Sequence, residues 1–555
     1  MSKDFKELTK DQLIDYINEL RKQLNNEKYG LYFDRKVTPE FIVEECKTKI
    51  PVLGRHSELD LINGGIEHIM IEGDNFQVLT SLNLINDGEG LIDVIYIDPP
   101  YNTGKKDFIY NDNFVTQDDP YYHTTWLNFM EKRLVLARDI LKDTGVILIS
   151  IDEHEFAQLK LLCDSIFGEK NFVEMFVYDK KSAPKGVPPK NMVVSVHEYI
   201  LCYAKDNEKF SFIGVPRSKK GWANPDNDPK GLWRNTNIKS TVSDRTFKVV
   251  NPETRDEFID TWACNEETMK QYIKEGRVIF PKDSSGQIRV KEYYSEMTNP
   301  NIPIKTSLGL FDAQWNTQML KKILGDKKFD NPKHLKLMEY IIGAAARKES
   351  VILDFFAGSG TTGHAVLNLN KEDNGNRKFI LCTNNENNIM SDICYPRIKS
   401  VINGKNYKGE EINEPFQDVS LRFFKAGFIE DDVSKDQAKY NLIEKSDGLL
   451  ILKEKIFDKV KEGKNFNIYS NNNTNRVMGI YNNYYDEKSF DEMLNEMKEL
   501  KYDENIVYYF SLDNNIDLTL ENKVKEVLNG CIVKPIPSKI YEIYKKISDD
   551  IKREY

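Results

Sequence analysis

Apolar residues recur with two different periods along the chain. Five short apolar runs have the length and composition of buried strands: 68–72, 91–97, 146–151, 350–354 and 379–382. Three helical patterns accompany them, from Phe76, over 126–141 and over 329–346. This alternation predicts an α/β domain in which a parallel sheet is covered by helices on both faces.

The alternation breaks near residue 180. From there to about 305, glycine, proline and asparagine recur among short aromatic-rich runs, which indicates a module inserted into the α/β domain. Beyond about 410 the pattern predicts strands at 476–481 and 506–511 and helices near 488–500 and 538–550. We expect this tail to form a small α+β accessory domain.

The N-terminal segment carries a short amphipathic pattern. Thr9 and Gln12 have the spacing of a capping box, and apolar residues recur at helical spacing at Leu13, Ile17, Leu20 and Leu24. The stripe predicts a helix that packs on a partner surface, and homodimerisation is the most specific form of that prediction. The predicted parts of the chain are a helical arm (1–50), the first half of the α/β domain (51–180), the insertion (181–305), the second half (306–405) and the accessory domain (406–555).

Composition places the chain among ordinary globular proteins. Of its 555 residues, 30% are charged and 40% hydrophobic. No apolar run approaches the roughly 18 residues that span a bilayer, and the N-terminus has no signal-peptide pattern, so we expect a cytoplasmic protein. The seven cysteines are scattered without any CxxC pair, which predicts neither a zinc site nor a disulfide framework.

Charge is distributed unevenly. The whole chain carries −10, but residues 180–248 contain fourteen Lys and Arg against six Asp and Glu, a local balance of +8. A basic segment inside an acidic protein is typical of a nucleic-acid contact, although a solvated insertion rich in loops has a similar composition.

Acidic residues follow four of the predicted strands. Asp74, Asp98, Asp354 and Glu386 each lie at or just beyond a strand end. Ligands of open parallel sheets bind at the carboxyl ends of the strands, and packing alone does not call for acids there. The four positions therefore predict one ligand-binding edge.

A glycine-rich turn follows the strand that ends at Asp354. Gly358, Gly360 and Gly363 satisfy GxGxxG, which allows a tight turn and a close approach of a nucleotide cofactor to the backbone. Glu386, after the next strand, is placed to bind ribose hydroxyls. By itself the pattern also fits a nicotinamide or flavin site, or a turn without any ligand.

The run Asp98-Pro99-Pro100-Tyr101 favours methylation of an amine. The lone pair of an exocyclic base amine is delocalised into the ring, so the nitrogen is a poor nucleophile. A carboxylate that accepts one N–H and a fixed backbone carbonyl that accepts the other would localise that lone pair. The tyrosine ring offers a surface on which a flipped base can stack.

These motifs resemble the beta class of DNA amino-methyltransferases, and within it the modification subunits of type III restriction–modification systems. Apart from the 98–101 motif, the runs that carry the resemblance are 73–75, 102–104, 107–114, 126–130, 149–153 and 354–360. The catalytic motif precedes the cofactor motif, with the basic segment between them, as in that class. The similarity covers roughly residues 60–400.

The resemblance implies a Rossmann-like, S-adenosylmethionine-dependent methyltransferase fold with an inserted target-recognition domain, an N-terminal helical arm and a small α+β C-terminal domain. It assigns Asp98, Pro99 and Tyr101, within the motif that includes Pro100, to the target adenine. The residues that it assigns to the cofactor are Asp74, Asp354, Phe356, Gly358, Gly360 and Glu386. Lys333 joins this set less securely, because His334 stands where the family often has proline.

Two further groups of residues remain open at this stage. Tyr110 and Phe114 either cover a flipped base or form the core of a hairpin. In the insertion, the residues that we consider for contacts with phosphates or base edges are Arg217, Lys219, Lys220, Trp222, Trp233, Arg234 and Asn235.

The resulting prediction is a site-specific DNA adenine-N6 methyltransferase that uses S-adenosylmethionine without a metal. It would be the modification and recognition subunit of a type III system, acting on double-stranded DNA with a separate restriction subunit, since the chain has no Walker motif of its own. The alternatives are a cytosine-N4 methyltransferase, a stand-alone adenine methyltransferase, a nicotinamide or flavin oxidoreductase and a non-catalytic DNA-recognition subunit.

Overall fold

The structure is a computed structural model. It describes residues 31, 33–35, 40–104, 107–110, 113–115, 119–181, 192–283, 285–297, 299, 301–325, 329–429, 447–481, 486–509, 518–528 and 530–535. The helices predicted over 9–25 and 538–550 lie outside these residues. Within them, no helix is both long enough and apolar enough to cross a bilayer.

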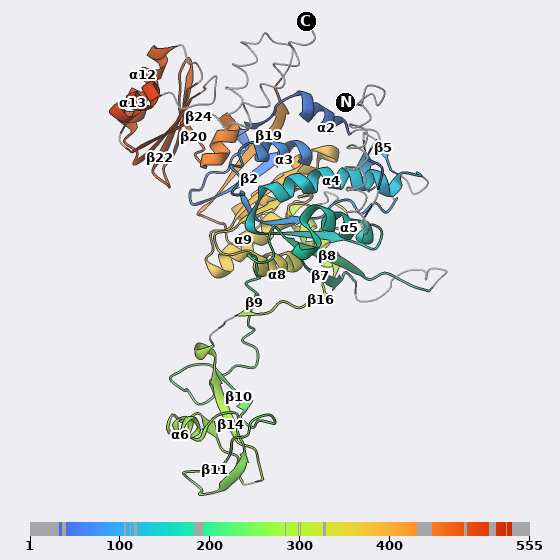
Figure 1. The fold of residues 1–555 in the computed structure, drawn as a ribbon, viewed down its shortest axis with the longest axis vertical. Helices are drawn as coiled ribbons and strands as arrows, with labels where there is room; N and C mark the ends of the chain where they lie inside the picture. The colour runs from blue at the N-terminus through green and yellow to red at the C-terminus, as the bar shows by residue number, and fades with distance from the viewer. Residues whose placement is uncertain are drawn as a thin grey trace, which may run out of the picture. The chain divides into compact units, whose positions relative to one another are not determined.

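A ten-stranded sheet forms the centre of the larger unit (Figure 1). Its strands, in spatial order, are β1 (Pro51–Arg55), β19 (Val419–Phe428), β2 (Ile66–Glu72), β18 (Lys378–Thr383), β17 (Val351–Asp354), β3 (Ile92–Ile97), β6 (Leu141–Ile151), β8 (His197–Ala204), β7 (Phe172–Asp179) and β16 (Ser307–Leu310). The six strands from β19 to β6 are parallel, whereas β1 and β8 run antiparallel to their neighbours. The predicted parallel sheet is therefore confirmed for the central strands.

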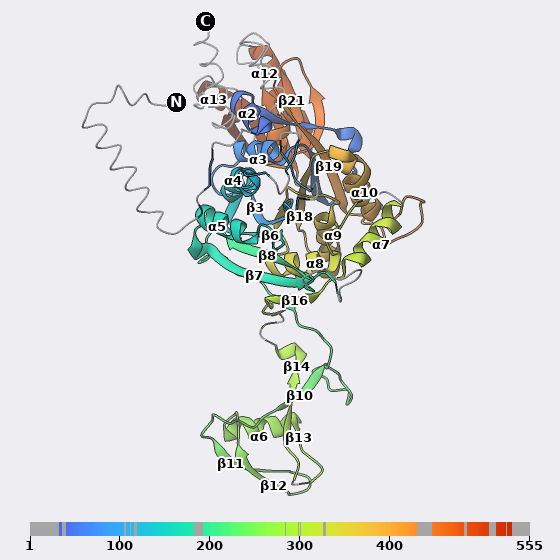
Figure 2. The ribbon, with the colours of Figure 1, turned by 90° about the vertical axis from the view of Figure 1, so that its right-hand side faces the viewer.

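Helices cover both faces of this sheet, as predicted (Figure 2). One layer contains α2 (Phe41–Thr48), α3 (Asn75–Leu84), α4 (Tyr122–Ile140) and α5 (Phe156–Phe167). The other layer contains α7 (Ala313–Leu324), α8 (Leu335–Ala345), α9 (Thr361–Asp373) and α10 (Tyr395–Asn403). Because the central strands are covered on both sides, most of their residues are buried apolar side chains.

The direction of the chain through the sheet reverses between β17 and β3. From β17 the chain passes through α9 to β18 on one side, and from β3 it passes through α4 to β6 on the other. In doubly wound sheets this reversal opens a crevice at the carboxyl ends of the two strands, where ligands bind. The fold thus places Asp98 and Asp354 at the two sides of that crevice.

The helix predicted over 329–346 is shorter than expected. Asn331 has a φ of +53° and precedes Pro332, so the helix cannot extend back to Phe329. The α8 helix begins at Leu335 instead, and its N-cap is His334, whose Nδ1 accepts the backbone N–H of Lys336 at 3.1 Å. This shortening leaves Lys333 in a non-helical segment.

The insertion packs as a separate unit over residues 214–304. It was expected to begin at residue 181, but β8, an apolar strand between β6 and β7, keeps residues 197–204 in the main sheet. The unit contains the sheet β10 (Trp233–Asn237), β14 (Arg289–Tyr293) and β13 (Val278–Ile279), the hairpin β11 (Thr246–Val250) and β12 (Glu257–Thr261), and helix α6 (Glu266–Lys274).

The insertion has a hydrophobic core of its own, formed by Ile238, Val249, Phe258, Trp262, Met269 and Ile288. At its base, β9 (Val215–Pro216) pairs with β15 (Asn301–Ile302) in antiparallel register. The chain therefore enters and leaves the unit side by side.

The accessory domain contains a five-stranded sheet in the order β20 (Asp458–Glu462), β21 (Phe466–Asn471), β22 (Arg476–Tyr481), β23 (Glu504–Tyr509) and β24 (Cys531–Pro535). Helices α12 (Glu487–Leu500) and α13 (Leu518–Val527) pack on it. The predicted α+β character is confirmed, but the boundary at 406 is wrong because β19 belongs to the main sheet, where it pairs with β2.

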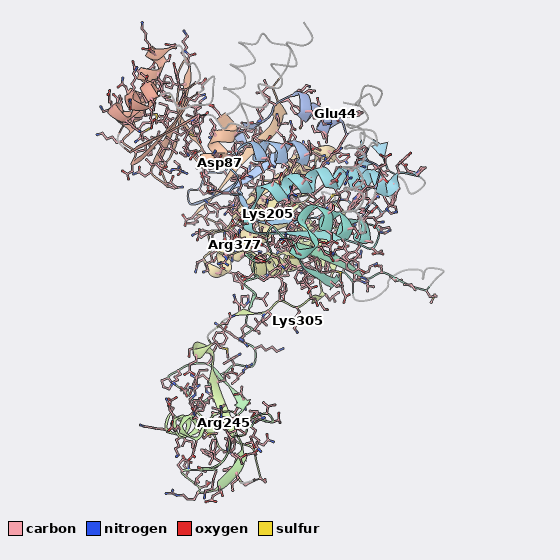
Figure 3. All side chains as sticks on the ribbon, viewed as in Figure 1. Glu44, Asp87, Lys205, Arg245, Lys305 and Arg377 are labelled. Carbon is pink, nitrogen blue, oxygen red and sulfur yellow. The ribbon has the colours of Figure 1, made fainter. Side chains whose placement is uncertain are left out.

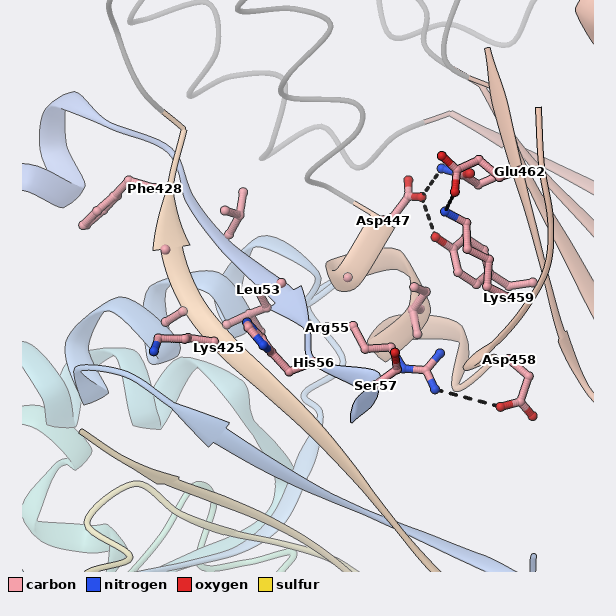
Figure 4. A pocket seen from close by; sticks show the side chains of 18 residues that line it. Leu53, Arg55, His56, Ser57, Lys425, Phe428, Asp447, Asp458, Lys459 and Glu462 are labelled. Carbon is pink, nitrogen blue, oxygen red and sulfur yellow. Dashed lines mark hydrogen bonds and ion pairs between the residues drawn. The ribbon is translucent and has the colours of Figure 1, made fainter. Parts of the chain in front are cut away.

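A cavity of about 810 Å³ lies between β1, β19 and the first strands of the accessory domain (Figure 4). Charged residues in its wall are largely paired with one another, as Lys459 is with Glu462 at 2.5 Å. Asp447 accepts hydrogen bonds from Asn467 and Tyr469, both at 2.7 Å. None of the predicted site residues lines this cavity.

Arg422 links the two sheets. Its side chain, only 2% exposed, contacts Glu67 of β2 at 2.7 Å and Asp458 of β20 at 2.9 Å. Asp60 lies 3.5 Å from the same guanidinium, and a buried cation with three carboxylate partners is costly to remove, because the acids are left without compensation.

We therefore expect Arg422→Met to lower the free energy of unfolding by about 3 kcal/mol. Lys371→Met is the matched control, because Lys371 forms an exposed ion pair with Glu414 and its loss should cost less than about 0.5 kcal/mol. Urea denaturation followed by circular dichroism measures both. Equal midpoints for the two variants would contradict a stabilising role for Arg422.

Candidate active site

The four acids predicted to share an edge lie at the ends of four neighbouring strands, β2, β18, β17 and β3. Asp98 follows β3 directly, and Asp354 is the last residue of β17. Asp74 caps α3 just beyond β2, and Glu386 lies beyond the end of β18. Because the strands are parallel, all four acids lie at one edge of the sheet.

Lys333 lies beside the 98–101 motif. Its ammonium nitrogen is 3.3 Å from the Asp98 carboxylate and 2.6 Å from the Glu198 carboxylate. The side chain of Lys333 is 12% exposed, and that of Asp98 is 28% exposed. Lys333 was expected beside the cofactor, whereas its contacts join it to the motif that we assign to the target base.

Glu198 is the acceptor around which the site is organised. Besides Lys333, its carboxylate accepts hydrogen bonds from the ammonium of Lys180 at 3.0 Å and from the hydroxyl of Tyr101 at 3.2 Å. The hydroxyl of Tyr178 donates to it as well. These donors come from β7, from the catalytic motif and from the segment before α8.

Burial and mutual charge set the ionisation of this cluster. Burial raises the pKa of Asp98, and the charge of Glu198 raises it further, while the Lys333 ammonium lowers it. Burial also opposes ionisation of Glu198, but Lys333 and Lys180 outweigh it and hold the pKa of Glu198 below its usual value. Despite its burial, Lys333 has a pKa well above the usual value because both carboxylates stabilise its charge. Lys333 and Glu198 are therefore charged at neutral pH.

Two hydrogen bonds fix the chain around the 98–101 motif. The indole N–H of Trp126, on α4, donates to the Pro100 carbonyl at 2.7 Å, which fixes the loop. Asn102, with a φ of +57°, is buried and donates to Glu155 at 2.6 Å. These two hydrogen bonds hold the chain on both sides of Tyr101, so the motif presents the Asp98 carboxylate from a fixed loop.

Residues of the glycine-rich turn are alternately accessible and buried. Phe356 and Gly358 are partly exposed, whereas Ala357 and Ser359 are buried. Gly358 and Gly360 have φ values of +49° and +77°, which favour glycine. A Cβ on Gly360 would lie 3.2 Å from the sulfur of Cys394, so Gly360 packs against α10 and not toward the edge that carries the acids.

The other predicted cofactor residues differ in exposure. Asp354 is 3% exposed and accepts the backbone N–H of Phe356 at 3.0 Å and the hydroxyl of Thr362. Asp74 Oδ1 accepts the N–H of Phe76 at 2.7 Å, and among the described residues no hydrogen bond reaches its Oδ2. Glu386 is exposed. Asp74 and Glu386 are thus the acids most open to a ligand.

Sequence reasoning missed Glu198 and Tyr178. One signal for Glu198 was present, because it is an acid at the start of the run 198–202, whose other residues are apolar. Trp126 was noted without a role. Tyr110, left open between a lid and a hairpin core, is 8% exposed and belongs to the hydrophobic core, as expected for the hairpin; the side chain of Phe114 lies outside the described residues.

The candidate DNA-contacting residues of the insertion also separate into two groups. Trp222 is buried, and Arg234 pairs with Glu292 at 2.6 Å, so both serve the fold of the unit. Trp233 donates its indole N–H to Asp226 at 2.8 Å. The remaining candidates are the exposed Lys219, Lys220 and Asn235 and the partly buried Arg217.

Comparison with known proteins identifies the class. The N6/N4 methyltransferase family, described as DNA methylase, matches residues 92–421, more than half of the chain. The match includes the 98–101 motif, the insertion and the glycine-rich turn. The chain belongs to this family.

Three relatives show which members of the family the chain is similar to. The type III restriction-modification enzyme StyLTI Mod subunit of Salmonella typhimurium is 36% identical over 354 residues, which make up 58% of this chain and 53% of that protein. The type II methyltransferase M.KpnI of Klebsiella pneumoniae is 34% identical over 64% of this chain and 87% of its own length. The EcoPI Mod subunit of Escherichia phage P1 is 30% identical over 68% of this chain and 66% of its own length. The chain thus spans about half of the first Mod subunit and two thirds of the second.

Asp354 provides a test of the electrostatics at this edge. Burial raises its pKa to about 7. An aspartate of the unfolded chain ionises near pH 4, so between about pH 4 and 7 the folded state holds a proton that the unfolded state has lost. Raising the pH through this window therefore removes stability, with no further change above it.

We expect Asp354→Asn, which can keep both hydrogen-bond partners, to gain stability relative to the wild type as the pH rises. The unfolding constants of the two proteins should diverge by up to about tenfold per pH unit until about pH 7. Urea denaturation at several pH values between about 5 and 8 measures the difference in the free energy of unfolding between the two proteins. The other titrating groups contribute equally to both proteins, so they cancel in this difference. A difference that does not depend on pH would show that Asp354 titrates normally.

Proposed function

We propose that the protein transfers a methyl group from S-adenosylmethionine to the N6 amine of adenine in double-stranded DNA. The observation that carries the proposal is the position of the 98–101 motif. It lies at the reversal point of the sheet beside the Asp354 turn, and the hydrogen bond from Trp126 to the Pro100 carbonyl fixes its loop. The motif thus offers a carboxylate beside rigid backbone carbonyls, the two kinds of acceptor that an exocyclic amine requires.

Each residue of the site has its own role toward the target base. Asp98 accepts one N–H of the flipped adenine amine and the Pro99 carbonyl accepts the other, which turns the nitrogen lone pair toward the methyl donor. Tyr101 stacks on the extruded base, and its hydroxyl is anchored on Glu198 at 3.2 Å. When bound, S-adenosylmethionine would supply a methyl group carried on a positively charged sulfur, and the rest of the cofactor would depart as a neutral thioether. The amine then sheds one proton, for which Asp98 is the nearest carboxylate.

The residues at the edge fit that cofactor. The exposed Glu386 and the open Oδ2 of Asp74 are acceptors suited to ribose hydroxyls and to an adenine amine. Phe356 and Gly358 form the accessible side of the glycine-rich turn, where the methionine portion would lie, with Asp354 beneath it. Gly360 supports this surface from behind through its packing on α10.

The insertion is the part of the chain that we assign to target recognition. Within its described residues, Lys219 and Lys220 form no ion pair, whereas Lys239, Lys248 and Lys291 are paired with acids. Arg245 is exposed on the same unit (Figure 3). Cations without acidic partners are available to neutralise phosphates.

The likeness to two Mod subunits supports a place in a type III restriction–modification system. We infer that the chain modifies and recognises DNA, while a separate restriction subunit cleaves it. Homodimerisation through residues 9–25 and flipping of the target base belong to the same proposal. The relative M.KpnI, a type II methyltransferase, supports methylation without such a partner as the alternative.

Cytosine-N4 methylation is the second candidate, because the family includes both amines. The acid at position 98 favours adenine. Digestion of modified DNA to nucleosides, followed by mass spectrometry, separates the two: N4-methylcytosine without N6-methyladenine would overturn the adenine assignment.

Replacement of Asp98 tests the mechanism. We expect Asp98→Ala to lower the rate of methylation by about 10³-fold or more, because the amine loses its charged acceptor, while DNA binding stays nearly unchanged. Asp139→Ala, which alters an exposed acid on α4, is the control and should keep normal activity. Product formation is followed with S-adenosylmethionine labelled in the methyl group. Retained methylation in Asp98→Ala would remove this residue from the mechanism.

The role of the insertion can be tested through salt dependence. For the double variant Lys219→Ala/Lys220→Ala we expect weaker DNA binding on all sequences. The slope of log affinity against log salt should fall by up to about 2, or about 1 for each lost phosphate contact. Lys248→Ala is the matched control, because that ammonium pairs with Glu257 at 2.9 Å. An unchanged slope in the double variant would place the DNA elsewhere.

A further inference from the structure

Glu198 is a buried acid that the proposed reaction does not use. It is 8% exposed and lies on β8, between β6 and β7, in a strand whose other central residues are apolar. A buried carboxylate is destabilising by several kcal/mol unless charges and hydrogen bonds compensate it. Here four donors do so, from Lys180, Lys333, Tyr101 and Tyr178. Two of these donors belong to the catalytic centre.

Lys333 lies closer to one of its two acidic partners than to the other. Its nitrogen lies 2.6 Å from Glu198 and 3.3 Å from Asp98, so Glu198 is the closer partner. Without Glu198, the ammonium would have Asp98 as its one carboxylate within 4 Å among the described residues. A full ion pair there would occupy the acceptor that the target amine needs.

Tyr101 depends on the same carboxylate. Its hydroxyl donates to Glu198 at 3.2 Å and accepts from Lys333, whose nitrogen is 4.9 Å from the centre of the tyrosine ring. One acid on β8 therefore holds both the ring that faces the base and the cation beside Asp98.

We propose that Glu198 is a positioning residue for methyl transfer: it draws Lys333 away from Asp98, so that Asp98 can accept the target amine, and it fixes the ring of Tyr101. This inference rests on the proposed function. A purely structural role, in which Glu198 only links β7, β8 and the start of α8, is the alternative that the experiment must separate.

Several titratable groups face Asp98 and bear on its ionisation: Lys333, Glu198, Tyr101, Tyr96 and Asp354. Of these, Lys333 and the hydroxyl of Tyr101 favour the charged form of Asp98, and the carboxylates of Glu198 and Asp354 oppose it. Removing the charge of Glu198 and removing that of Lys333 must therefore shift the pKa of Asp98 in opposite directions.

The test compares Glu198→Gln and Lys333→Met in the full-length protein, by the pH dependence of kcat for DNA methylation. In Glu198→Gln we expect the acid limb to move to lower pH by about one unit, because a negative neighbour is gone. In Lys333→Met we expect it to move to higher pH by a similar amount. In both variants kcat at neutral pH should fall at least tenfold, with KM for DNA within about twofold of wild type.

Glu174→Gln, an acid-to-amide change on the adjacent strand β7, is the matched control and should leave the acid limb in place. Glu198→Asp keeps the charge but shortens the side chain, so it should lower kcat while the acid limb stays near that of the wild type. In the DNA complex of Glu198→Gln we expect the Tyr101 ring to be held less firmly. The fluorescence of 2-aminopurine at the target position measures this change, because it depends on stacking against the ring.

Acid limbs that move in the same direction, or remain in place, in correctly folded Glu198→Gln and Lys333→Met would overturn the positioning role. If Glu198→Gln does not fold, Lys333→Met decides alone, and an unmoved acid limb contradicts the proposal. A wild-type protein that forms no N6-methyladenine would instead refute the proposed function, so the two failures are distinguishable.

Discussion

Parallel pairing of β2, β18, β17 and β3 is the constraint on which the candidate active site depends. Hydrogen bonding between parallel strands fixes their relative register, and their carboxyl ends must then lie at one edge. Acids that are as far apart in sequence as Asp74 and Glu386 become neighbours at that edge without any direct contact between them. The reversal of chain direction between β17 and β3 adds the crevice in which a cofactor and a base can meet.

Much of this edge could be predicted from the sequence, because each part of it is local. A buried apolar run followed by an acid is visible without a partner strand, as at Ile97 and Asp98. Glu198 and Lys333 are different. Their contact requires the antiparallel placement of β8 beside β6 and the loss of the first helical turn expected before α8. Neither event leaves a periodic pattern in the sequence. The start of the insertion was misplaced for the same reason, since β8 pairs with β6 although β7 lies between them in the sequence.

Charge at this edge works against stability. Asp98, Glu198 and Asp354 are acids held in or near the core, and Lys333 provides the cation that lies between two of them. A site selected for folding alone would replace such a cluster by apolar side chains of similar volume. The chain instead keeps the acids and surrounds them with donors such as Tyr178 and Thr362. The main sheet, buried on both faces, supplies the stability that this arrangement requires.

The antiparallel pair β9 and β15 has a consequence for how such proteins diversify. Because β9 and β15 pair where the chain enters and leaves the insertion, and because the unit has a core of its own, its residues can be exchanged as one block. Recombination between related genes at these two strands would replace the surface that we assign to target recognition and leave Asp98, Lys333 and Glu198 in place. New target sites can then arise in a single genetic step, faster than by the accumulation of point substitutions.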